Sequence, residues 1–95
     1  MRKILIVDGI NISITVQDLT DMPHLKQYSS KKYGIWCHDE NWDVAQEDLV
    51  WILRDKVHSY LQLPYSKLLT ERDRRLWKTY QCLVQKGFSY KPIDK

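Results

Sequence analysis

Five positively charged side chains in the second half of the chain have the types and spacing that suit chemistry with phosphate. They are Lys67, Arg72, Arg74, Arg75 and Lys78. On an α-helix, Arg74 and Lys78 lie four residues apart and share a face, with Arg75 beside them. Several cationic donors within one or two turns can bind the phosphates of a nucleic acid backbone. The cluster is typical either of a phosphate-binding surface or of a solvated helix face, in which Glu71 and Arg75 pair at i,i+4.

Aromatic residues are abundant for a chain of this length. They make up 12 % of the 95 residues and include four Trp and six Tyr. Aromatic and Arg side chains contribute most of the binding energy at protein interfaces. We therefore expect a small accessory or regulatory protein without catalytic activity that docks on a larger protein partner. The residues expected to bind this partner are Trp51, Arg74, Arg75, Trp77 and Lys78.

Two alternative functions fit the same sequence. The first is a regulator that binds nucleic acid through the five cations of the second half. Helix, short turn and basic helix is the outline of a helix-turn-helix reader of DNA. However, Glu71 and Asp73 lie in the turn that would approach the DNA, and the connection holds Pro64 and no Gly.

The second alternative rests on a resemblance at the start of the chain. The run Ile4–Asn11, ILIVDGIN, resembles the first strand of the PIN-like and NYN nuclease superfamily, where an apolar strand ends in Asp-Gly-x-Asn. The resemblance covers about eight residues. It implies a metal-dependent nuclease in which Asp8, and more loosely Asn11, would hold a divalent cation. It also implies a parallel α/β sheet with a helix after Gly9.

The element that organises the rest of the chain is a β-hairpin that turns at Asp8-Gly9. A two-residue type I′ turn needs positive φ at both positions, which Gly adopts freely and Asp tolerates. This turn fixes the register, so that Val7 faces Ile10 and Leu5 faces Ile12. One face of the hairpin is then apolar and carries Leu5, Val7, Ile10, Ile12, Ile14 and Val16. Its unpaired edge leaves a homodimer through strand pairing open.

Two helices are expected to cover the apolar face of the hairpin. The first runs from the Asp39 region to about Leu61, because its apolar residues recur at three- and four-residue steps. Its candidate N-caps are Asp39, Asn41 and Asp43, and Asp43 resembles a capping box. The second begins near Ser66 or Thr70 and stops at Gly87, with Phe88 folded back onto Leu83.

The remaining segments carry weaker signals. We expect a connection with a short turn of helix over residues 17–32, and a third short strand over Tyr33–Cys37 is left open. Residues 89–95 are expected to form a C-terminal tail. The predicted fold is α+β: one domain over residues 1–95, with an antiparallel hairpin packed against two antiparallel helices.

Charge and cysteine usage set further bounds. The net charge is +3, but residues 1–50 carry −3 and residues 51–95 carry +6. A basic half favours nucleic acid or an acidic protein surface as a partner. The chain shows no disulfide framework, signal-peptide pattern or long apolar run, so we expect a cytoplasmic protein with reduced Cys37 and Cys82 and no membrane contact. Cys37-His38 lacks a second pair at ligand spacing, so no metal or cofactor is expected.

Overall fold

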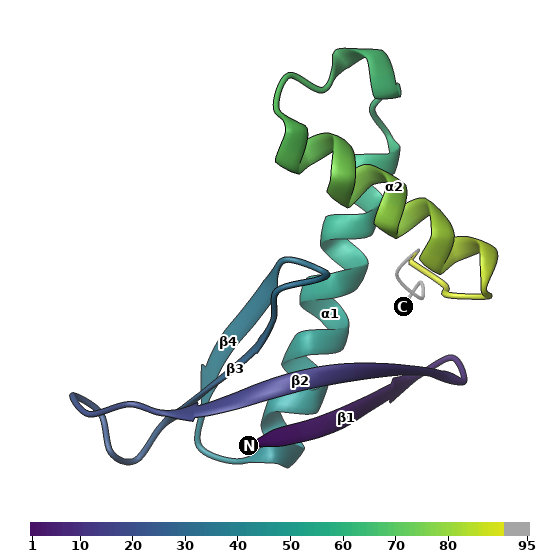
Figure 1. Cartoon of the computed structure of the whole chain (residues 1–95). Coiled ribbons are helices and arrows are strands. Elements are labelled where there is room, and N and C mark those ends of the chain that lie inside the picture. The colour runs from purple at the N-terminus through teal and green to yellow at the C-terminus, as the bar shows by residue number, and fades with distance from the viewer. Residues whose placement is uncertain (91–95) are drawn as a thin grey trace.

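A computed structural model describes residues 1–90 and shows an antiparallel sheet packed against two helices. The elements in chain order are β1 (Arg2–Val7), β2 (Ile10–Asp18), β3 (Lys26–Ser30), β4 (Ile35–Asp39), α1 (Trp42–Leu61), a 3₁₀ turn (Tyr65–Lys67) and α2 (Glu71–Gln85). The strands lie in the sheet in the order β1-β2-β3-β4. α1 runs behind the sheet, and α2 crosses the far end of α1 obliquely (Figure 1). The predicted α+β fold is confirmed.

The hairpin at Asp8-Gly9 forms as predicted. Asp8 has φ 52° and Gly9 has φ 76°, so both central residues of the turn are in the left-handed region that a type I′ turn needs. Val7 pairs with Ile10 and Leu5 pairs with Ile12. β2 continues two residues beyond the predicted Val16, because it also pairs with β3.

The prediction of an irregular connection over residues 17–32 is wrong for Lys26–Ser30, which form β3. This strand has only one large apolar residue, Tyr28, which is 2 % exposed. Tyr28 is opposite Val16 on β2 and Cys37 on β4, so pairing on both sides holds a segment of low hydrophobicity in the sheet. The possible third strand over Tyr33–Cys37 is present as β4, which begins and ends two residues later in the chain.

The helix ends follow the predicted side-chain chemistry. Asn41, one of the three candidate caps, begins α1, and its Oδ1 accepts a hydrogen bond from the Val44 N–H at 3.1 Å. Thr70 begins α2 in the same way. Gly87 has φ 110°, and the Phe88 N–H donates to the Leu83 carbonyl at 3.2 Å. The predicted glycine cap of α2 is therefore confirmed.

The core lies between the sheet and the two helices. α1 buries an apolar stripe formed by Ala45, Leu49, Leu53 and Val57. α2 adds Leu76, Tyr80 and Leu83 to the same core. Burial of a large aliphatic or aromatic side chain contributes about 1.5–3 kcal/mol, so these stripes account for much of the stability. Within residues 1–90, neither helix has the length and apolar character that crossing a membrane would require.

After α2 the chain returns to the hairpin turn. The Ser89 N–H donates to Asp8 Oδ2 at 2.8 Å, and the rings of Tyr90 and His58 are 6.0 Å apart. These two residues therefore contact the body of the protein. The rest of the predicted tail, residues 91–95, lies outside the described residues.

Candidate functional site

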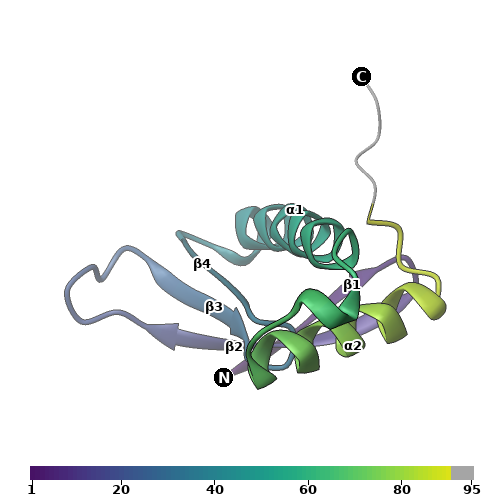
Figure 2. The same ribbon diagram turned by 90° about the horizontal axis from the view of Figure 1, so that it is seen from above.

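The sheet has one face covered by α1 and one face open to solvent (Figures 1 and 2). Side chains alternate between these faces along each strand. The open face carries two exposed isoleucines on β1, Ile4 and Ile6. Elsewhere it carries small or polar residues on β2 and β3 and two rings on β4: Ser13, Thr15, Gln17, Gln27, Ser29, Trp36 and His38. Arg2 extends the same face at β1 and donates a hydrogen bond to Ser13 Oγ at 2.9 Å. Beyond β1 this surface is mostly polar and is suited to contact with a polar ligand.

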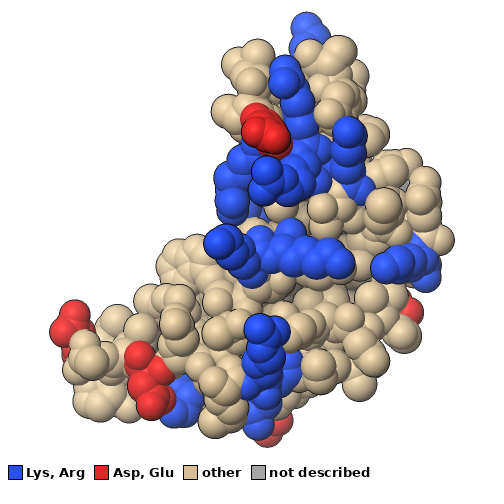
Figure 3. Space-filling view, viewed as in Figure 1, with Lys and Arg blue, Asp and Glu red and all other residues tan. Residues whose placement is uncertain are grey.

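Cations from three separate parts of the chain gather above this open face. They come from α2, from the turn between β3 and β4, and from β1, and we call them the basic band: Arg2, Lys31, Lys32, Arg72, Arg74, Arg75 and Lys78. Three shallow hollows connect them, because Arg75 lines two hollows and the Lys31-Lys32 pair lines two. Figure 3 shows Lys and Arg side chains from α2 down to the sheet on this face.

The cations on α2 are placed by contacts with the segment that precedes the helix. Arg74 Nε donates to the Leu68 carbonyl at 3.0 Å, and Lys78 Nζ is 5.3 Å from the centre of the Tyr65 ring. Arg75 and Glu71 form the predicted i,i+4 pair at 3.8 Å. Their side chains are 71 % and 89 % exposed, so the pair contributes little stability and Arg75 can exchange Glu71 for another anion.

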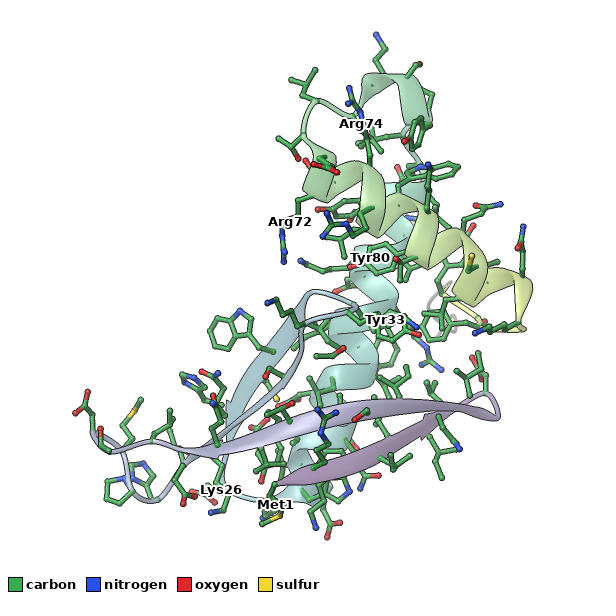
Figure 4. The ribbon with its side chains drawn as sticks, viewed as in Figure 1. Met1, Lys26, Tyr33, Arg72, Arg74 and Tyr80 are labelled. Carbon is green, nitrogen blue, oxygen red and sulfur yellow. The ribbon has the colours of Figure 1, made fainter. Side chains whose placement is uncertain are left out.

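Two tyrosines fix α2, one against the turn between β3 and β4 and the other against α1. The Tyr80 hydroxyl donates to the Tyr33 carbonyl at 2.6 Å, and the Tyr60 hydroxyl donates to Asp73 Oδ1 at 2.8 Å. The Tyr60 and Tyr80 rings meet edge to face at 5.3 Å. This arrangement brings Arg72 beside the turn, as the view with side chains shows (Figure 4).

The protonation of these tyrosines follows from their surroundings. Burial raises the pKa of Tyr80, and the charge of nearby Arg72 only partly opposes this rise. Burial also raises the pKa of Tyr60, and its hydrogen bond to Asp73 acts in the same direction. Both hydroxyls therefore keep their protons at neutral pH and remain donors that hold α2 in place.

The structure brings some of the predicted residues together and separates others. Arg74, Arg75 and Lys78 line one hollow, and Lys67 is exposed in the 3₁₀ turn before α2. Trp77 is half-buried, and its Nε1 donates to the Leu63 carbonyl at 3.0 Å, so it holds the α1–α2 connection. Trp51 lies on α1 and lines a different hollow, next to β1.

Sequence reasoning missed the part of the site that lies outside α2. Lys31, Lys32 and Arg2 are far from α2 in the sequence, and only the folded sheet places them beside it. The adjacent lysines of the β3–β4 turn are the sequence feature that could have indicated this part of the site. Trp36 could be assigned to the open face only from the register, in which its neighbours Ile35 and Cys37 are buried.

Asp8 does not have the surroundings that the nuclease resemblance implies. Asp8 is in the hairpin turn and accepts a hydrogen bond from Ser89. Gly9 is followed by β2, so the helix and the parallel sheet implied by the resemblance are contradicted by the structure. Over residues 1–90, no three His, Cys, Asp or Glu side chains form a group that could hold a metal ion.

Comparisons with known proteins give no relative from which a function could be inferred. No protein-family model, curated protein or solved structure matches this chain.

Proposed function

We propose that this protein binds nucleic acid through the basic band and acts as a regulator rather than as an enzyme. The observation that carries the proposal is the meeting of cations from α2, the β3–β4 turn and β1 on one face. Cations scattered over a sequence are usually solvated separately, whereas a continuous row above a polar sheet matches the regular charge of a phosphate backbone. The helix-turn-helix outline has no role in this proposal, because Arg2, Lys31 and Lys32 of the band lie outside α2.

The arrangement of the band supports a contact along several phosphates. Arg72 and Arg75 face the lysines of the β3–β4 turn across one hollow of about 460 Å³. Arg guanidinium groups bind phosphate oxygens in pairs, and Lys adds a mobile point charge. A strand of nucleic acid that followed the band would therefore meet donors from α2 on one side and from the sheet on the other.

The proposal is tested by the salt dependence of binding to short labelled oligonucleotides. Each phosphate neutralised contributes about −0.7 to the slope of log K against log salt for a single strand, and about −0.9 for a duplex. With about five contacts, we expect the affinity for a single strand to fall by roughly 100-fold between 50 and 200 mM salt. Fluorescence anisotropy measures this directly. Absence of binding at 50 mM salt, or a slope near zero, would contradict the proposal.

Docking on a protein partner is a second candidate, and the β1 edge of the sheet favours it. Ile4 and Ile6 on β1 are 51 % and 66 % exposed, and Ile6 lines a hollow with Val50 and Trp51. Exposed apolar and aromatic side chains are typical of the centre of protein interfaces. A specific protein complex that persists at a salt concentration where oligonucleotides dissociate would favour this function. The homodimer through the edge of β1 stays a prediction.

A further inference from the structure

A hollow of about 540 Å³ lies between the open face of β3 and β4 and the start of α2. Its floor includes Ser29 and Trp36, which pair in register across the two strands. Its wall carries Lys31, Lys56 and Arg72, so the hollow adjoins the basic band. An aromatic ring and several cations therefore face the same space.

Trp36 is the most exposed of the aromatic rings on the sheet. The residue is 59 % exposed, although it lies within β4, where it is the second residue. The His38 ring supports it from one side at 4.9 Å, with an angle of 52° between the rings. The residue opposite Trp36 is Ser29, which is too small to cover an indole. The ring is thus held in position and still presents a large area to the hollow.

The polar groups around Trp36 are also held in position. His38 Nε2 and Gln27 Oε1 are 3.1 Å apart, which orients both side chains on the open face. Lys56 Nζ donates to the Gly34 carbonyl at 2.9 Å, and this contact keeps its charge at the rim of the hollow. Arg72 reaches the same rim from α2, near Gly34.

We infer that this hollow binds an unpaired base of a single-stranded nucleic acid, stacked on Trp36, with the adjoining phosphate on Arg72, Lys31 and Lys56. The inference rests on the proposed function and names the form of nucleic acid that the site takes. In a duplex, both faces of a base are covered by its neighbours, so a base can stack on Trp36 only where the strand is unpaired. Aromatic platforms beside a basic groove bind single strands with little sequence preference.

The test compares Trp36→Ala with Trp36→Phe in titrations with a labelled oligothymidylate and a duplex of the same length. Loss of a stacking ring weakens single-strand binding by roughly 10-fold or more, so we expect this loss for Trp36→Ala and near-complete retention for Trp36→Phe. The salt slope should stay unchanged, because no cation is removed. Trp51→Ala is the matched control, since it removes an exposed Trp from another hollow, and it should not change the affinity.

A second measurement needs no variant. The base analogue 2-aminopurine, placed within the oligonucleotide, loses fluorescence when it stacks on an aromatic ring, so wild-type protein should quench it. Unchanged affinity in Trp36→Ala, or equal weakening of single-strand and duplex binding, would overturn the inference about Trp36. If binding still weakened steeply with salt, the proposed function would stand. Absence of any salt-dependent binding by the wild type would overturn both.

Discussion

Replacing Arg72 and Arg75 together with glutamate is expected to lower the affinity for a single-stranded oligonucleotide by about 100-fold at 50 mM salt. Two phosphate contacts contribute about −1.4 to the salt slope, so they account for roughly 60-fold in affinity between about 1 M and 50 mM salt. The new negative charges add repulsion. The slope itself should become less steep by about 1.4. Both residues line the hollow that joins α2 to the β3–β4 turn, and both are exposed, so the fold should not change.

As a matched control, a second double variant changes the net charge by the same amount at positions outside the basic band. Lys3→Glu combined with Lys86→Glu alters two cations that line none of the hollows described above. The Lys3 side chain lies on the opposite face of β1 from Arg2, and Lys86 follows the end of α2, so neither is expected to contact a strand on the band. We therefore expect a loss of less than about threefold at the same 50 mM salt, because partly screened charges act only at a distance. Equal losses in the two double variants would mean that binding follows net charge and that the band has no particular role.

The second large effect concerns stability. Tyr80→Ala is expected to lower the free energy of unfolding by about 3–5 kcal/mol, the range for loss of a buried large aromatic side chain. Tyr80 is completely buried and contacts Tyr60 edge to face. Natural domains are stable by only about 5–15 kcal/mol, so Tyr80→Ala should unfold a large part of the protein at moderate urea concentrations. Urea titration followed by Trp fluorescence measures the change.

Two further substitutions separate the hydroxyl of Tyr80 from its ring. Tyr80→Phe keeps the packing and leaves the buried Tyr33 carbonyl without its donor, which should cost about 1–3 kcal/mol. Tyr65→Phe removes a hydroxyl from an exposed tyrosine and should change stability by less than about 0.5 kcal/mol. If Tyr80→Phe were as mild as Tyr65→Phe, the bond to Tyr33 would not be what holds α2 on the turn.

Local chemistry explains which parts of the fold could be predicted from the sequence. The turn at Asp8-Gly9 and the end of α2 at Gly87 depend on backbone conformations that few residues adopt, so the sequence signals them directly. The Thr70 cap is read from one side chain and its neighbours. β3 could not be predicted, because a segment with Tyr28 as its one large apolar residue becomes a strand only between β2 and β4.

The same distinction between local and long-range determinants applies to the residues of the site. Helical spacing is local, so the sequence alone places Arg74, Arg75 and Lys78 near one another, and in the structure they line one hollow. Arg2 and Lys31 join them through the sheet register and the bond between Tyr80 and Tyr33, which connects residues 47 positions apart. Trp51 and Trp77 show the opposite case: both were expected at one interface, yet Trp77 supports a loop and Trp51 lines a separate hollow.

In the proposed complex, nucleic acid lies on the face shared by the open sheet and α2. The most direct measurement is an NMR titration of ¹⁵N-labelled protein with a short single strand at low salt, which locates the bound strand residue by residue. We expect the amide shifts to concentrate in residues 29–36 and 72–78. Shifts confined to the Ile6 and Trp51 surface, or no shifts at saturating oligonucleotide, would contradict it.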